Sequence, residues 1–117
     1  MTLEELYRDV AIFNKSEPPI PDFLLYYDMA VRAILTRYPK KLLIPEGEYV
    51  TPESLEEGFA LPDSFFFAVF YFVCASTRID SRICDLLFEA ADDRAEKAFR
   101  SIWREHARGK RLQGDRW

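Results

Sequence analysis

The sequence predicts an all-α protein, a small bundle of about four helices with an irregular segment between the second and third helices and a flexible C-terminal tail. Apolar residues recur at helical spacing along most of the chain, prolines stand where helices begin or end, and one long apolar run requires burial. A length of 117 residues suits one domain. We expect residues 1–108 to form the helical domain and 109–117 the tail.

The first helix is expected from Thr2 to Phe13. Thr2 and Glu5 have the spacing of a capping box, in which the two side chains hydrogen-bond the free amides at a helix start. One face carries the apolar residues Leu3, Leu6, Val10 and Phe13. The segment 14–21, NKSEPPIP, then interrupts the helix, because its three prolines cannot continue it.

The second helix is expected to begin at Pro21 and Asp22 and to end before Pro39, since a residue that precedes proline avoids helical geometry. Its apolar face carries Leu24, Tyr27, Val31, Ile34, Leu35 and Tyr38. A short linker separates it from the first helix, so the two are expected to pack as a helical hairpin.

Residues 40–60 are expected to be irregular. Two short β-prone runs around Pro45–Gly47 permit a small β-hairpin, and a plain loop fits the same residues. The stretch from Thr51 to Gly58 begins with a capping residue and a proline and ends with glycine, which predicts one or two turns of helix.

The apolar run Phe65–Ala75 contains eleven residues, six of them aromatic, and no charge. A strand is the rival interpretation, but the run is longer than most strands and the sequence offers no second strong strand to pair with it. A helix that is apolar all round belongs at the centre of a bundle. We expect Phe66, Val69, Phe70 and Val73 in the core of the monomer, and we expect the side of Phe65 and Phe72 to contact a neighbouring subunit.

The last helix is expected to begin with Asp80 or Ser81 as its cap, to run to about Arg108 and to end at Gly109. Its inner stripe is formed by Ile83, Leu87, Ala90, Ala91, Ala95, Ala98 and Ile102, with Phe99 beside them. The alanines allow another helix to approach closely.

Composition excludes several classes of protein. The net charge of −4 gives no overall nucleic-acid footprint, and two cysteines with one histidine give neither a disulfide scaffold nor zinc spacing. The Phe65–Ala75 run is too short to cross a membrane, and the acidic N-terminus lacks an apolar signal core. We therefore expect a protein of a reducing compartment, with reduced thiols at Cys74 and Cys84, no membrane, no metal and no cofactor.

No catalytic set can be named from the sequence. His106 has no identifiable orienting partner. The acidic residues of the last helix, Glu89, Asp92, Asp93 and Glu96, alternate with Arg94 and Lys97 and predict a solvated, salt-bridged face. We expect no enzyme, although a pocket with converging polar groups would reverse that expectation.

Charge is unevenly distributed. Residues 100–117 carry six basic and two acidic side chains, whereas the other 99 residues carry 10 basic and 18 acidic ones. An acidic body with a basic tail is suited to docking on another protein. The residues predicted to dock are Arg108, Lys110, Arg111, Leu112, Arg116 and Trp117. Base stacking on Trp117 is the weaker alternative.

The order of these segments resembles the small helical head–tail connector (adaptor) proteins of tailed bacteriophages. The similarity is carried by short motifs: LEEL at the start of the first helix, LTRYP at the end of the second, LPDSF before the apolar helix, FEAA and AF in the last helix, and the basic tail. Together these motifs cover nearly the whole chain.

The resemblance implies a structural protein of the virion, assembled in the cytoplasm of a bacterial host. Copies, commonly twelve, would form a ring beneath the portal protein, extend the DNA channel without recognising a specific nucleic acid, and present a surface to the next tail component. The C-terminal segment would be the docking arm. The alternatives are a small bacterial interaction or regulatory domain that dimerises and, with less support, an enzyme.

Overall fold

The computed structural model describes residues 1–45, 47–78 and 80–114, and of 81 and 110–114 the backbone alone. Within this part of the chain the protein is helical, with no strand: α1 is Leu3–Asn14, α2 Ile20–Arg37, α3 Lys40–Leu43, α4 Phe66–Ser76 and α5 Ser81–Gly114. A 3-10 turn, Asp63–Phe65, leads into α4. The all-α prediction is confirmed, while α3 was not predicted as a helix.

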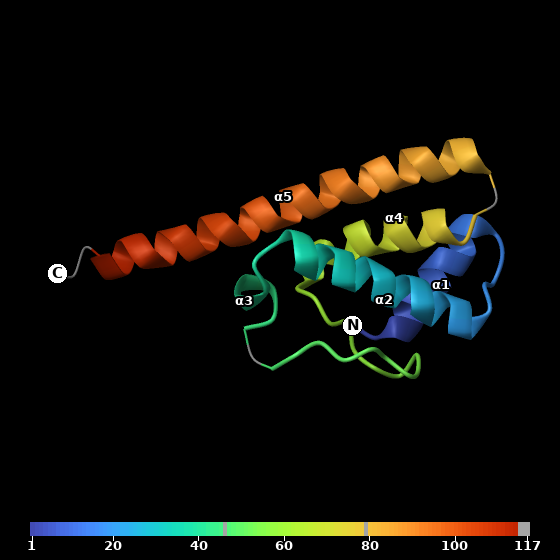
Figure 1. The fold of residues 1–117 in the computed structure, drawn as a ribbon, viewed down its shortest axis with the longest axis horizontal. Helices are drawn as coiled ribbons and strands as arrows, with labels where there is room; N and C mark the ends of the chain where they lie inside the picture. Colours follow the sequence, from blue (N-terminus) through green and yellow to red (C-terminus); the bar gives the residue numbers. More distant parts are fainter. Residues whose placement is uncertain (46, 79, 115–117) are drawn as a thin grey trace.

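Helix α4 is the centre of the bundle, because α1, α2 and α5 all pack against it. In Figure 1, α5 lies along one side of α4, and α1 and α2 lie on its other sides. The core contains residues of all five helices, among them Leu6, Val31, Leu43, Val69 and Ala95. Helices α1 and α2 also meet, where the rings of Tyr7 and Phe23 contact edge to face at 5.1 Å.

The predicted capping box at the start of α1 is wrong. Thr2 makes no side-chain cap hydrogen bond. The free amides of Leu3 and Glu4 instead donate to the backbone carbonyls of Glu57 and Leu55, both at 2.9 Å. Thr2 and Gly58 form an isolated antiparallel bridge. The irregular segment thus satisfies the helix start that the Thr2 side chain was expected to cap.

Residues 44, 45 and 47–60 form a loop along the side of the bundle, so of the two interpretations of this segment the plain loop is correct for these residues. The stretch Thr51–Gly58 forms turns and not the predicted helix. The loop is held to α2 by side chains. Tyr49 and Thr51 donate hydrogen bonds to the Asp28 carboxylate at 2.7 and 3.0 Å, and the amide of Ala60 donates to the Tyr27 hydroxyl at 2.9 Å.

Helix α5 is longer than predicted, since it continues through Gly109 to Gly114. At about 1.5 Å per residue its 34 residues span about 50 Å, close to the 56 Å long axis of the molecule. Asp80 caps its start as expected, its carboxylate accepting from the amide of Arg82 at 3.0 Å. Figure 1 shows the C-terminal part of α5 extending beyond the bundle. We call residues 103–114 the arm.

The outward side of α4 differs from the prediction. Phe65, expected at a subunit contact, is fully buried, and Phe66, expected in the core, is only partly buried. Val69, Phe70 and Val73 are buried as predicted. The most exposed aromatic side chain of the run is Phe67, at 50%. The reason is the 3-10 turn, which points Phe65 inward before α4 begins.

The contrast between the two neighbouring phenylalanines can be tested by substitution. We expect Phe65→Ala to lower the free energy of unfolding by about 3–5 kcal/mol, because it empties a fully buried site. The matched control Phe67→Ala removes a half-exposed ring and should cost less than about 1.5 kcal/mol. Urea unfolding followed by circular dichroism measures both. Equal losses would contradict the orientation of α4.

Asp28 should make the attachment of the loop dependent on pH. Burial raises the pKa of its carboxyl, but hydrogen bonds from Tyr49, Arg32 and Thr51 outweigh that effect, so the pKa lies below its ordinary value of 3.8. The carboxylate therefore stabilises the fold above about pH 4, and this contribution disappears as the pH falls through the folded-state pKa.

Asp28→Asn should accordingly lower the free energy of unfolding at pH 7 by about 1–3 kcal/mol, the value of hydrogen bonds to a charged group. The difference from the unmodified protein should shrink below about pH 4. Denaturation across the pH range measures it, with Glu48→Gln, at an exposed site of the same loop, as control. A difference that stays constant from pH 7 to pH 3 would show that the charge of Asp28 does not contribute.

Candidate functional site

The acidic side chains of α5 form a solvated face, as predicted. Asp93 pairs with Lys97 at 2.9 Å and Glu96 with Arg100 at 2.6 Å, and all four side chains are exposed. Among the described residues, no group of three or more histidine, cysteine or carboxylate side chains is arranged to hold a metal ion. This face provides charge and helix stability.

The histidine and the cysteines are placed separately. His106 is partly exposed and lies against Trp103, with 5.8 Å between the ring centroids. Both cysteines are free thiols. Burial raises the pKa of Cys74 to about 12, which keeps it protonated and unreactive. The Cys84 thiol donates to the carbonyl of Ala75 at 3.1 Å and so helps to join the ends of α4 and α5.

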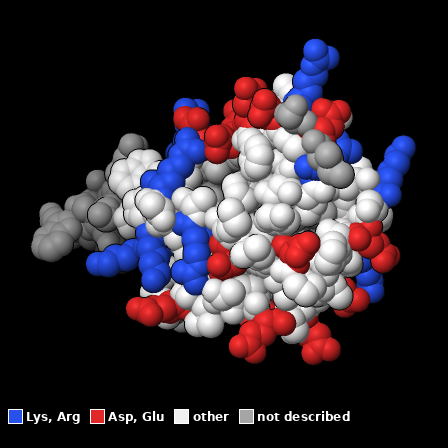
Figure 2. Space-filling model, turned by 45° about the vertical axis from the view of Figure 1, so that its right-hand side comes forward, with Lys and Arg blue, Asp and Glu red and all other residues white. Residues whose placement is uncertain are grey.

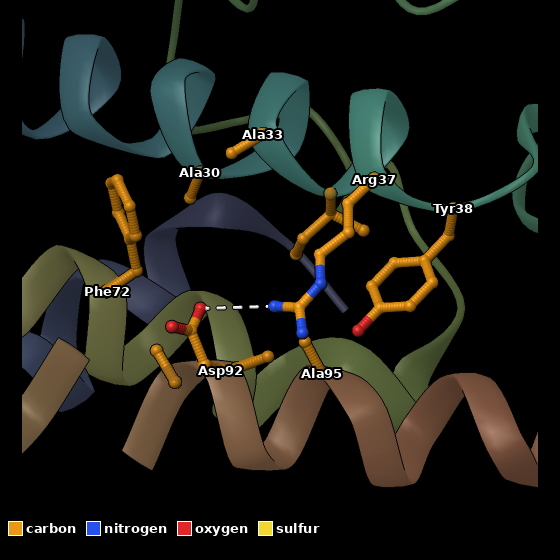
Figure 3. Close-up of a pocket in the computed structure, with 10 residues that line it drawn as sticks. Ala30, Ala33, Arg37, Tyr38, Phe72, Asp92 and Ala95 are labelled. Atoms are coloured by element: carbon orange, nitrogen blue, oxygen red, sulfur yellow. Dashed lines mark hydrogen bonds and ion pairs between the residues drawn. The ribbon is translucent and has the colours of Figure 1, made fainter. Parts of the chain in front are cut away.

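A small cavity of about 70 Å³ lies between α2, α4 and α5. Figure 3 shows how it is closed: Arg37 extends from α2 toward Asp92 on α5, with 3.4 Å between Nη1 and Oδ1, and the Tyr38 ring lies beside them. The other walls are mostly alanine. This space suits a few water molecules and not a drug-sized ligand, for which pockets of about 300 Å³ or more are usual.

An apolar groove lies between α1 and α4, along the flank of the buried stripe of α1. Its volume is about 260 Å³. The lining residues are Asp9, Ile12, Phe13, Phe66, Phe67 and Phe70. Ile12 is 75% exposed and Phe13 40%. We call these residues the α1/α4 groove. Exposed apolar side chains clustered in this way are typical of surfaces that bind a partner or a ligand.

The arm is the second surface. Trp103, at its start, is 51% exposed, and Arg104 and Arg108 are exposed beside it. Figure 2 shows a group of basic side chains on the side toward the arm and others at the top and right of this face, with acidic side chains around a broad uncharged area. The uneven charge predicted from the sequence therefore lies partly in the arm, at one end of an elongated molecule.

The predicted docking residues are only partly placed. Arg108 is an exposed residue of α5, and Lys110, Arg111 and Leu112 belong to the same helix. The predicted end of the last helix at Gly109 is thus wrong, because α5 continues to Gly114. Arg116 and Trp117 lie outside the described residues. Of the two predicted subunit contacts, Phe65 is buried, and Phe72 is partly buried against Phe88, with ring centroids 5.3 Å apart.

Sequence reasoning missed the groove residues Ile12 and Phe67 and the arm residue Trp103. Ile12 lies opposite the buried stripe of α1, so an apolar residue on the polar face was the available signal. Trp103 gave a similar signal, because it is a large apolar residue that follows Ile102 and lies outside the predicted inner stripe of the last helix. Phe67 gave no such signal, because a helix that is apolar all round does not indicate which side faces outward.

None of the known protein families, curated proteins or solved structures compared with this chain gives a significant match. None of the described helices is both long and apolar enough to span a membrane.

The arm helix can be tested at Gly109, which lies inside α5, where an added Cβ would meet no atom within 4 Å. Gly109→Ala should stabilise the local helix by about 0.5–1 kcal/mol, since glycine loses more backbone entropy than alanine. We expect slower amide hydrogen exchange in residues 105–112 and unchanged exchange in α4. Faster exchange in the arm of this variant would contradict a continuous helix.

Proposed function

We propose that this protein is a structural component of the virion of a tailed bacteriophage, a head–tail connector that forms a ring beneath the portal and links the capsid to the tail. The observation that carries the proposal is the arm, a basic helical extension of an acidic bundle. A projecting helix contributes little to the bundle's own core, so its natural role is to contact another protein.

The charge of the bundle supports a place around a DNA channel. Outside residues 100–117 the chain carries 18 acidic and 10 basic side chains. An acidic wall repels the phosphate backbone, which lets DNA pass without binding, and nucleic-acid-binding proteins show the opposite charge. On this proposal the bundles form the ring, and DNA moves through its centre.

The separate surfaces support assembly into a ring. Each subunit of a cyclic ring contacts two neighbours through two different surfaces, and the groove and the arm are two such surfaces on one chain. Segment 109–117 then extends from the ring as the docking element for the portal, and a further face remains for the next tail component. The protein acts through contacts and without catalysis, in the assembled particle and during assembly in the host cytoplasm.

A second function is favoured by a specific observation, the exposed Phe67 side of α4. A small helical interaction domain of a bacterium would cover this side by pairing with an identical copy. Such a dimer leaves the arm without a role and needs no portal. A test with a portal protein therefore distinguishes the two functions.

The proposal is tested by adding the protein to a purified portal protein from the same genome and imaging the particles. We expect ring-shaped density on one end of the portal. Shortening the chain to residues 1–108 should remove this binding and leave the helical circular dichroism spectrum of the bundle. The control Lys40→Gln with Lys41→Gln removes two exposed positive charges elsewhere and should bind normally.

A stable dimer that ignores the portal would overturn the connector proposal in favour of the interaction domain. Binding of the shortened chain as tight as that of the full chain would show that segment 109–117 is not the docking element. A portal or capsid gene beside the gene of this protein would support the connector independently.

A further inference from the structure

We propose that the arm of one copy docks into the α1/α4 groove of a second copy, so that the chains associate head to tail. The groove and the arm are both surfaces of this chain that its own fold leaves open. The occupant we assign to the groove is therefore the arm of an identical subunit, with the side chain of Trp103 as its apolar anchor.

The groove is apolar where the anchor would bind. Ile12, Phe13 and Phe67 are 75%, 40% and 50% exposed, and Phe66 and Phe70 form the floor between them. Phe13 and Phe70 contact edge to face at 5.4 Å, which leaves an aromatic wall for a further ring. Tryptophan is the residue type most enriched among binding anchors, and it prefers such desolvated pockets.

The arm cannot fill the groove of its own chain. Figure 1 shows the C-terminal end of α5 at the far end of the molecule from α1 and the turn between α4 and α5. From Ser81 to Gly114 the helix is continuous, so the arm cannot fold back without breaking. Contact between these two surfaces therefore requires a second molecule.

The charges beside the two surfaces are spaced alike. Glu5 and Asp9 lie four residues apart on the exposed side of α1 that also carries Ile12. Arg104 and Arg108 lie four residues apart on the arm. Among the residues the structure describes, none of these four takes part in an ion pair, whereas the neighbouring Glu4 pairs with Arg8 at 2.8 Å. Four residues of helix correspond to about 6 Å, so both pairs have the same pitch.

These spacings determine the direction of docking. With Trp103 at Ile12 and Phe13, an arm that runs antiparallel to α1 places Arg104 next to Asp9. One turn further it places Arg108 next to Glu5. Residues 109–114 then extend past the neighbour and stay free to dock elsewhere. A parallel arm would carry both arginines away from the acidic part of α1.

Two arginines lie beside the groove on the sides away from Asp9 and Glu5, and their positive charges favour the same direction of docking. The guanidinium of Arg94 on α5 lies 5.6 Å from the centre of the Phe67 ring, and that of Arg78 lies 5.3 Å from the centre of the Phe13 ring. They would repel an arm whose arginines faced α5 or the end of α4. Only the α1 side, with Asp9 and Glu5, favours the basic edge of the arm.

A contact between two different surfaces generates a closed ring if the rotation closes and an open filament if it does not. The contact between arm and groove would thus be the subunit contact of the proposed ring. Only the closure into a ring rests on the proposed function, and the contact itself does not. Its test needs only this protein, so it can fail while portal binding succeeds.

The test uses two variants, each with one defective surface, and measures mass in solution by light scattering over a range of concentrations. Trp103→Ala keeps the groove and loses the anchor, while Phe67→Asp keeps the arm and places a charge in the groove. We expect the unmodified protein to form assemblies larger than two subunits. Each variant alone should associate at least about tenfold more weakly.

Mixing the two variants is the decisive measurement. An equimolar mixture retains one intact groove and one intact arm, so we expect heterodimers that neither variant forms alone. Leu25→Asp, which charges a 55% exposed leucine on α2 outside the groove, is the control and should assemble like the unmodified protein. Circular dichroism of each variant checks that the bundle is folded.

Three outcomes would overturn the inference. The first is an unmodified protein that remains monomeric at every concentration. The second is a Trp103→Ala variant that associates normally while Phe67→Asp does not, which would indicate two-fold pairing of the Phe67 sides. The third is a mixture without heterodimers. Weakening by Asp9→Arg that is reversed by Arg104→Glu on the partner copy would support the antiparallel direction.

Discussion

The burial of α4 is the constraint on which the rest of this structure depends. A helix with the sequence FFAVFYFVCAS is apolar on every side, and water is a poor environment for all of it. Three helices, α1, α2 and α5, cover most of its circumference, and each presents a stripe of apolar or small residues to it. Three neighbours do not close the circle, so the side with Phe67 stays half exposed beside Phe13. The candidate docking groove is thus the remainder of an incomplete enclosure, and it exists because the bundle is small.

The fold also depends on the loop that precedes α4, because this loop contacts both α1 and α2. The amides at the start of α1 bind carbonyl groups of the loop that precedes α4, and Asp28 on α2 holds the same loop through Tyr49 and Thr51. The loop lacks repetitive hydrogen bonding of its own, but it is attached at both sides and satisfies a helix end that would otherwise be open to water. This attachment fixes the direction of α1 across α4 and, with it, the position of Ile12 and Asp9 at the groove.

The helix of the arm is stabilised by interactions other than those of the bundle. Its residues leave the bundle, so no tertiary burial supports them, and the helix there depends on local propensity and on i,i+4 ion pairs such as Glu96 with Arg100 at its base. A helix of this kind gains from a partner that covers its exposed Trp103. The groove and the arm therefore complement each other: the groove is an exposed apolar surface, and the arm is a helix without tertiary contacts to stabilise it.

The sequence by itself determined where the four longer helices begin, because apolar spacing, prolines and the Asp80 cap act locally within a few residues. It also determined the separation of charge and the helical nature of Phe65–Ala75. Only the tertiary structure decided which side of that run faces outward, since a segment without a polar face carries no directional signal. The same holds for the start of α1, where backbone groups more than fifty residues away replace the expected Thr2 cap. At Gly109 a local signal was misleading. The helix propensity of glycine is about 1 kcal/mol less favourable than that of alanine, and this difference was too small to end a helix flanked by strong helix formers.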